Sequence, residues 1–356
     1  MKETIKDQED LRQECKLASK FWGRAFSALT AAVYRENGYE QLEKLWHDLL
    51  CTHQKSYYRE GLLKLGIPSD DPPAVAAAKY HYLSNQIGGL DMEYIEESPQ
   101  KVWIRYLGPM WTYGGVAMIS IPAKLRRAIF SAWHPRNGFF MDCPRLGYVG
   151  TKFVMEGDPY DEGYFMEYDH DLRQDEIMRF ETVDHTPEFD SAKAPKLDPQ
   201  KWPEARKLKA ERNYSAGYFR GTMDVLYNAV GKEHAEYILR QSMRLLAVQY
   251  TPELLEAAGI NPECRDVRGV CGFFSELLKA TKQCFKVEVI SSTQARIILD
   301  SFEPFETEAS EGLRNACFAF QETSARMISR GHINVSRHMK EHAEIWDITD
   351  HGIWLY

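Results

Sequence analysis

Apolar residues recur every three to four positions in residues 31–67, the spacing that places them on one face of an α-helix. Leu42, Leu45, Trp46, Leu49 and Leu50 follow this spacing, and Gly66 comes near the end of the segment. Glycine often stands just after a helix because it adopts a left-handed conformation without steric cost. The pattern predicts a helix that stops before Gly66. Residues 224–260 repeat it, and there Pro252 is expected to open a second helix.

Apolar and polar residues alternate in four other stretches, which is the pattern of half-buried β-strands. Each stretch contains a turn, such as Ser98–Pro99 in the first and Gly157–Asp158–Pro159 in the third. The predicted hairpins cover residues 92–108, 286–302, 148–169 and 333–350. Helical periodicity predicts further helices at 73–88, 125–134, 267–283 and 313–329.

The chain contains an internal duplication. Residues 26–67 align without a gap on residues 219–260, and LRRAIFSA (125–132) recurs as LRNACFAF (313–320). The identical pairs include Tyr34/Tyr227, Gly38/Gly231, Glu43/Glu236, Tyr57/Tyr250 and Gly66/Gly259. A fixed period of this kind indicates two copies of one structural unit.

The order of elements within each copy is helices, hairpin, helix and hairpin, which predicts an α+β fold with a small antiparallel sheet covered on one face. We expect a first repeat at 1–183, a proline-rich linker at 184–210 and a second repeat at 211–356. The two tandem copies are expected to pack as a pseudo-dimer.

Composition narrows the class of protein. The 356 residues are 44% hydrophobic and 27% charged, which is ordinary for a globular chain of about two domains. The net charge of −8 argues against a nucleic-acid surface, and no apolar run approaches the ~18–20 residues of a membrane span. The first residues do not resemble a signal peptide, and the seven cysteines form no C-x-x-C pair. We expect a cytoplasmic protein with no nucleic-acid or membrane partner.

Polar residues among the aromatic residues of the first copy are the candidate site. His134 is the candidate acid or base. The duplication places Glu322 opposite it, and Cys143 is another polar residue of the same segment as His134, so both are further catalytic candidates. A surface histidine before Pro135 with its hydrogen bonds satisfied is the competing interpretation. The candidate substrate-binding residues are Arg126, Trp111, Trp133, Tyr160 and Arg326, because aromatic walls with a few charged groups are typical of small-molecule sites.

Metal and cofactor binding have weaker support. His338 and His342 are the candidate metal ligands, although they are expected to flank a hairpin turn, where solvated histidines are the simpler interpretation. The acidic stretch 156–171 matches no calcium loop. We predict no cofactor, with a metal ion or haem as open alternatives.

Residues 92–111 and 146–169 resemble the L-2-amino-thiazoline-4-carboxylic acid hydrolase-like proteins, which are similar to the 4-vinyl reductase, or hydrocarbon-binding, domains. The resemblance rests on the order hairpin, helix and Gly-Asp hairpin, and it implies a ligand cavity between helices and sheet. That family usually has a cysteine after the Gly-Asp turn, where this chain has Tyr160, Asp161 and Glu162.

These features favour an enzyme for a small molecule, a hydrolase or lyase acting on a C–N or C–S bond of a heterocyclic or aromatic carboxylic acid. In that interpretation Arg126 or Arg326 holds the carboxylate. The alternative is a non-catalytic small-molecule binding or sensor protein, and a third possibility is a scaffold. A homo-oligomer is also open.

Overall fold

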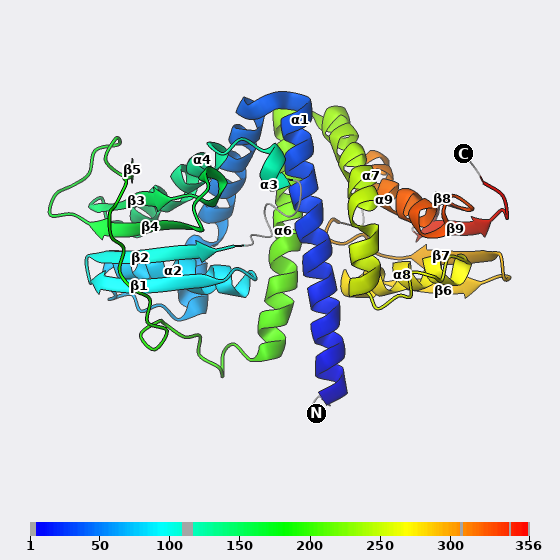
Figure 1. The fold of residues 1–356 in the computed structure, drawn as a ribbon, viewed down its shortest axis with the longest axis horizontal. Coiled ribbons are helices and arrows are strands. Elements are labelled where there is room, and N and C mark those ends of the chain that lie inside the picture. The colour runs from blue at the N-terminus through cyan, green and yellow to red at the C-terminus, as the bar shows by residue number, and fades with distance from the viewer. Residues whose placement is uncertain (1–4, 109–116, 307–308, 342, 355–356) are drawn as a thin grey trace. The chain divides into compact units, whose positions relative to one another are not determined.

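The computed structural model describes residues 5–108, 117–306, 309–341 and 343–354. Long helices and two small sheets make the protein α+β, as the sequence predicts (Figure 1). Contacts divide the chain into two compact units, which we call unit 1 (Met1–Glu36 with Glu211–Tyr356) and unit 2 (Asn37–Ala210). The first 36 residues therefore group with the second half of the chain rather than with the segment that follows them.

Two glycines interrupt the long helices at positions that the predicted duplication aligns. Helix α1 spans Ile5–Leu65 with a kink at Gly38 (φ 81°, ψ −177°), and Gly231 (φ 80°, ψ 161°) separates α6 (Glu204–Val230) from α7 (Lys232–Ala257). A positive φ is costly for any residue with a Cβ, so glycine suits both positions. The helix predicted before Gly66 ends at Leu65, which confirms that prediction.

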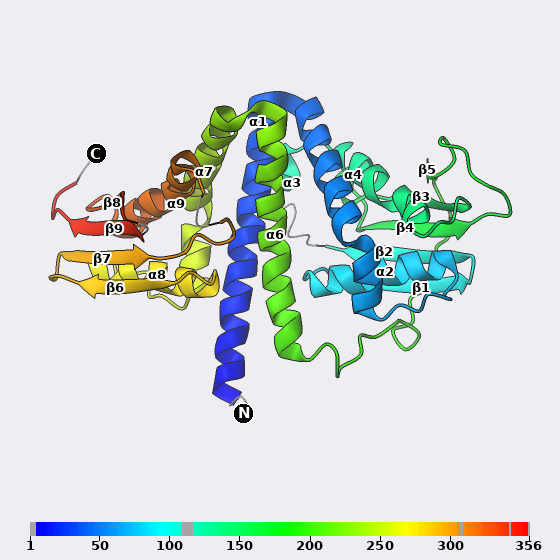
Figure 2. The same ribbon diagram turned by 180° about the vertical axis from the view of Figure 1, so that it is seen from behind.

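Unit 2 contains a five-stranded sheet with the order β1-β2-β4-β3-β5. The strands are β1 (Met92–Ser98), β2 (Lys101–Leu107), β3 (Leu146–Lys152), β4 (Tyr160–Glu167) and β5 (Met178–Phe180). Helix α2 (Pro73–Ile87) packs on β1, β2 and β4, and Figure 2 shows it lying across them. Both hairpins predicted in this half are confirmed.

The segment that leads to the candidate site is a run of short helices. Their bounds are α3 (Ala117–Ser120), α4 (Leu125–Trp133), the 3₁₀ turn η2 (His134–Arg136), α5 (Asn137–Phe140) and the 3₁₀ turn η3 (Val154–Glu156). Helix α4 buries the face that carries Arg126, Phe130 and Trp133. Because η2 follows directly, His134 lies on the same inward side as this face.

The segment after β4 covers the other face of the unit 2 sheet. Trp103, Val149 and Tyr164 form a buried cluster there, against which Val183 packs. The Tyr164 hydroxyl donates to Glu181 at 3.1 Å, and Arg105 Nη2 donates to the Pro187 carbonyl at 2.7 Å. This cover explains why β2 and β4 are buried on both faces instead of alternating.

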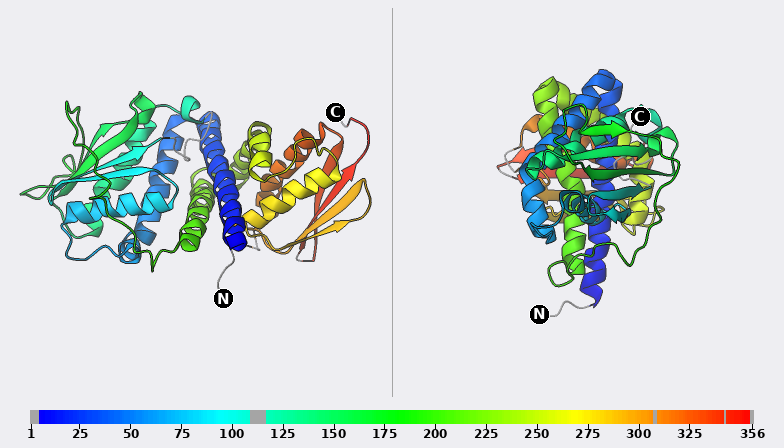
Figure 3. Two further views of the ribbon diagram at one scale, coloured as in Figure 1. Left: turned by 60° about the horizontal axis from the view of Figure 1, so that its bottom comes forward. Right: turned by 90° about the vertical axis from the view of Figure 1, so that its left-hand side faces the viewer.

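Unit 1 contains a four-stranded antiparallel sheet with the order β6-β7-β9-β8, the same order as β1-β2-β4-β3. Its elements are α8 (Val267–Ala280), β6 (Phe285–Val289), β7 (Gln294–Leu299), α9 (Glu311–Ser329), β8 (Ile333–Lys340) and β9 (Ala343–Asp350). Helices α8 and α9 lie on one face of the sheet (Figure 3). Exposure alternates along β7, as expected of a strand with one covered face.

Three details differ from the sequence predictions. Pro252 lies inside α7 and does not open a new helix; the hydroxyl of the preceding residue, Thr251, donates to the Ala247 carbonyl at 2.6 Å within this continuous helix. Helix α6 already begins at Glu204, inside the predicted linker. Strand β5 pairs in parallel with β3, so the unit 2 sheet is mixed and not purely antiparallel.

Candidate functional site

His134 belongs to a buried hydrogen-bond network in unit 2. Its Nε2 lies 2.9 Å from the Tyr106 hydroxyl, which lies 3.0 Å from His81 Nδ1. His81 Nε2 accepts from Trp133 Nε1 at 3.1 Å and faces Asn137 Nδ2 at 2.8 Å. His134 and Trp133 were candidates from the sequence, and in the structure His81 and Tyr106 connect them. Neither His81 nor Tyr106 was a candidate from the sequence.

The partners of the two histidines fix one consistent arrangement of protons. Two N–H donors face His81 Nε2, so that nitrogen accepts and Nδ1 carries the proton, which it donates to Tyr106. Tyr106 then donates to His134 Nε2, and His134 Nδ1 donates to the Phe130 carbonyl at 3.2 Å. All four imidazole nitrogens are engaged within the fold. His134 therefore has its hydrogen bonds satisfied, as the competing interpretation expected, but it is buried and not a surface histidine.

Stacked rings surround His134. The Phe130 ring lies on one side (4.5 Å between centroids, 4° between planes), and the His81 ring is also stacked on it (4.4 Å, 14°). Burial lowers the pKa of His134 well below its usual value, and it lowers the pKa of His81 to about 3. Both rings are therefore neutral near pH 7 and cannot act as cations.

Arg126 is the other candidate that lies in this interior. Its guanidinium donates from Nε (2.8 Å) and Nη2 (2.6 Å) to Asp161 Oδ2, and both side chains are buried. Asp161 Oδ1 accepts from the backbone N–H of Val154 at 3.0 Å. The charge of Arg126 is balanced within the fold, so a substrate carboxylate would have to compete with Asp161.

The remaining candidates of the first copy lie apart from this network. Cys143 is buried in the turn before β3, where its N–H donates to the Gly138 carbonyl at 2.8 Å. Tyr160, at the start of β4, accepts from Lys152 Nζ at 3.1 Å and lies under the Arg105 guanidinium. Trp111 falls outside the described residues.

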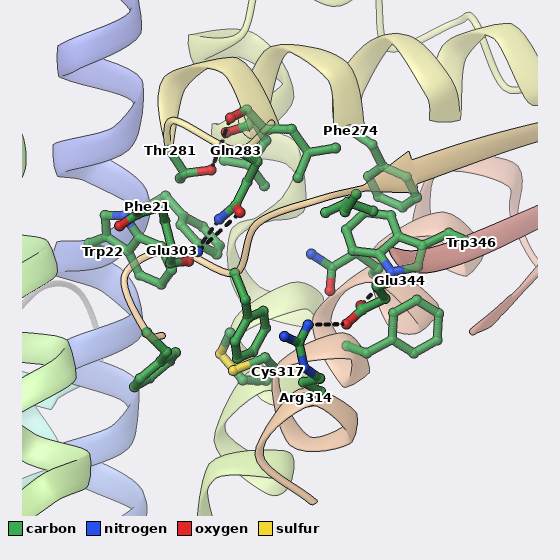
Figure 4. Close-up of a pocket in the computed structure, with 18 residues that line it drawn as sticks. Phe21, Trp22, Phe274, Thr281, Gln283, Glu303, Arg314, Cys317, Glu344 and Trp346 are labelled. Carbon is green, nitrogen blue, oxygen red and sulfur yellow. Dashed lines mark hydrogen bonds and ion pairs between the residues drawn. The ribbon is translucent and has the colours of Figure 1, made fainter. Parts of the chain in front are cut away.

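A pocket opens in unit 1, among residues that sequence analysis did not select as a site (Figure 4). The pocket encloses a volume of ≈ 50 Å³, or ≈ 600 Å³ when the open solvent at its mouth is included. Most of its walls are aromatic or aliphatic side chains from α1, α7, α8, α9, β7 and β9 and from the segment after β7. The aromatic ones are Phe21, Trp22, Phe274, Phe302, Phe305, Phe318 and Trp346.

A buried ion pair forms one wall of this pocket. Arg314 Nη1 donates to Glu344 Oε2 at 2.8 Å, and the guanidinium lies over the Phe302 ring at 4.4 Å (Figure 4). Glu344 Oε1 accepts from Trp346 Nε1 at 2.7 Å and lies 3.1 Å from Arg337 Nε. The carboxylate thus has three partners, which offset the cost of burying its charge.

Two smaller polar groups of α9 also line the pocket. Burial raises the pKa of the Cys317 thiol, so the thiol is protonated near pH 7. Gln321 Oε1 is buried and has no hydrogen-bond partner among the described residues. An unpaired buried amide oxygen costs about 1–3 kcal/mol, so a donor that reached it would stabilise this wall.

The other candidates of the second copy lie outside the pocket lining. Glu322 and Arg326 are partly exposed residues of α9, and the described residues that line the pocket include neither. His338 lies on β8, with Nδ1 3.5 Å from Asp347 Oδ2, and His342 falls outside the described residues. In the described part of the chain, no three His, Cys, Asp or Glu side chains are grouped to hold a metal ion.

Sequence reasoning missed Arg314, Glu344 and Gln321, although one signal pointed to the first. The duplicated LR pair aligns Arg314 with Arg126, and each arginine is ion-paired with a buried strand carboxylate. Glu344 and Gln321 had no such signal, because neither residue is part of a motif.

Comparison with known proteins leaves the fold and the site to be interpreted from their own geometry. No family model, no curated protein and no solved structure matches the chain. Within the described ranges, no helix combines the length and the apolar character that a membrane span requires.

Proposed function

We propose that the protein binds a small, mostly apolar molecule in the unit 1 pocket, without catalysing its conversion. The observation that carries this proposal is a concave, aromatic-walled pocket with a few buried polar groups, which is the usual construction of a small-molecule site. The buried Arg314–Glu344 pair gives one wall a fixed polar surface, and Gln321 adds an amide oxygen with no partner among the described residues.

We further infer that the two units descend from one duplicated ancestor and that smaller side chains opened the pocket of unit 1. The common strand order and the matching conformations of Gly38 and Gly231 support this inference. In the register of LRRAIFSA and LRNACFAF, Trp133 corresponds to Gln321 and Ile129 to Cys317. Smaller side chains therefore stand in unit 1 at the places where unit 2 has a buried indole and an isoleucine.

Binding is favoured over catalysis because the groups that could transfer protons are inert. His134 is buried, neutral and engaged at both nitrogens. Cys317 lines the pocket, but its raised pKa keeps it a thiol, whereas the nucleophile in covalent catalysis is the thiolate. Hydrolysis or cleavage of a C–N or C–S bond, the activity that the sequence favours, is the alternative that the following experiment also tests.

The experiment compares ligand binding by the wild-type chain and by two variants, Gln321→Trp and Cys317→Ile. Each variant introduces into unit 1 the side chain found at the aligned position of unit 2. Single-ring aromatic compounds are screened by ligand-observed NMR. We expect binding by the wild-type protein and loss of binding in Gln321→Trp, with Gln294→Trp, an exposed position of β7, as the control. Equal binding by all variants would place the ligand elsewhere, and product formation in the same samples would favour the enzyme.

A further inference from the structure

We infer that the ligand of the unit 1 pocket is a neutral, single-ring aromatic compound that bears an O–H or N–H donor, in other words a phenol-like molecule and not a carboxylic acid. This inference rests on the proposed function and adds the chemical class of the ligand. It departs from the aromatic carboxylic acid that the sequence favours.

The dimensions and walls of the pocket favour a small aromatic ligand. Its enclosed volume of ≈ 50 Å³ is smaller than the ~150 Å³ apolar cavity that holds benzene, so a ring would occupy the open mouth as well as the enclosed part. The walls on opposite sides carry Trp22 and Trp346, together with several phenylalanines (Figure 4). Aromatic rings pack favourably on such walls in offset or edge-to-face arrangements.

The charges of the pocket disfavour an anion. Arg314 is the only cationic side chain among the described lining residues, and its Nη1 is 2.8 Å from Glu344 Oε2. Glu344 also lines the pocket. A ligand carboxylate that approached Arg314 would therefore be repelled by the neighbouring carboxylate of Glu344. An anion would lose its hydration without gaining a net positive partner, which is costly in an apolar site.

The polar groups that line the pocket favour a ligand with a hydrogen-bond donor. Gln321 Oε1 is a buried acceptor without a partner among the described residues. The other lining amide, Gln283, is already engaged, since Nε2 donates to the Glu303 carbonyl at 2.8 Å and Oε1 accepts from Ser301 Oγ at 2.9 Å. A phenolic O–H would supply the donor that Gln321 lacks.

The test measures the affinities of phenol, anisole and benzoate for the full chain, by titration followed with NMR at pH 7. Anisole keeps the ring but has no O–H, and benzoate is an anion. We expect phenol to bind more tightly than both, and Gln321→Leu to weaken phenol about 2- to 12-fold while leaving anisole within 2-fold. Gln294→Leu, on the exposed side of β7, is the matched control and should change neither affinity.

The outcomes separate this inference from the proposed function. Binding of benzoate or anisole as tight as phenol, or a loss in Gln321→Leu that is the same for phenol and anisole, would overturn the ligand class and leave the pocket as a binding site. If none of the three compounds bound, both would be overturned. Gln321→Met keeps the length of the side chain and removes the acceptor, so it serves as the second variant, with the same expected result, should the leucine variant not fold.

Discussion

At the scale of single residues, His134 shows how burial changes the chemistry of a side chain that sequence reasoning can locate. Its place next to Arg126 and several aromatic residues made it a candidate acid or base. In the fold, two stacked rings and two hydrogen bonds hold it as a neutral imidazole. The sequence shows neither His81 nor Tyr106 beside it, because these residues come from α2 and β2 and meet it only through tertiary packing.

The buried histidines predict how stability depends on pH. The pKa of His81 falls to about 3 and that of His134 falls well below its usual value of about 6.5, so the unfolded chain binds protons that the folded chain excludes. Stability from this source is complete above pH 6.5 and is lost as the pH falls toward 3. At pH 5 each histidine should cost about 2 kcal/mol in the free energy of unfolding.

Urea unfolding at pH 7.5, 6 and 5 measures this loss. The variant His81→Gln should show a smaller loss between pH 7.5 and pH 5 than the wild-type protein, whereas His170→Asn, at an exposed histidine, should not alter it. A wild-type free energy of unfolding that is constant from pH 7.5 to pH 5 would contradict the neutral, buried network.

The ion pairs of neighbouring arginines predict a contrast in stability. Arg126 and Asp161 are both buried, so Asp161→Asn removes the carboxylate that balances a buried guanidinium and should cost about 3–5 kcal/mol. Arg127 pairs with Glu156 in a more exposed place, where Glu156→Gln should cost at most about 1 kcal/mol. Chemical unfolding of both variants measures the difference. Similar losses in the two variants would show that burial does not set the strength of these pairs.

At the scale of helices and strands, the sequence predicted an element correctly where the apolar pattern extended over enough residues to show its period. The four predicted hairpins and the helices on either side of them are present. Strand β5 was missed because its three residues are too few to show alternation, and its pairing with β3 depends on the segment that crosses the sheet. Pro252 was misinterpreted because α7 continues through it, and the sequence alone does not show this continuation.

The glycines between the long helices give a prediction at this scale. Gly38 and Gly231 have positive φ, and a Cβ added to either meets no atom within 4 Å, so Gly38→Ala and Gly231→Ala should cost about 1–2 kcal/mol from backbone conformation alone. Gly217 also has open space, but it lies inside α6 without a positive φ, so Gly217→Ala should stabilise by about 0.5–1 kcal/mol. Thermal unfolding of the three variants gives the signs. Stabilisation by alanine at position 38 or 231 would contradict the left-handed conformation.

At the scale of the whole molecule, contacts group residues that are far apart in the chain. Unit 1 takes Met1–Glu36 together with Glu211–Tyr356, and α1 passes from one unit into the other next to its kink at Gly38. Sequence repeats mark which segments are alike, but they do not show which segments pack together. The pocket was missed for the same reason, since Phe21 and Trp22 line it beside residues more than 200 positions later.

The central claim is that unit 1 binds a small apolar molecule in its pocket. The most direct test uses the protein labelled with ¹³C at its methionine methyl groups, because Met243 lines the pocket and reports its occupation. The Met243 signal is assigned with Met243→Leu, and phenol is then titrated into the wild-type protein and Gln321→Trp. We predict a saturable shift of the Met243 signal in the wild-type protein that is absent from the variant. A Met243 signal that phenol leaves unchanged, or shifts equally in both proteins, would contradict the account.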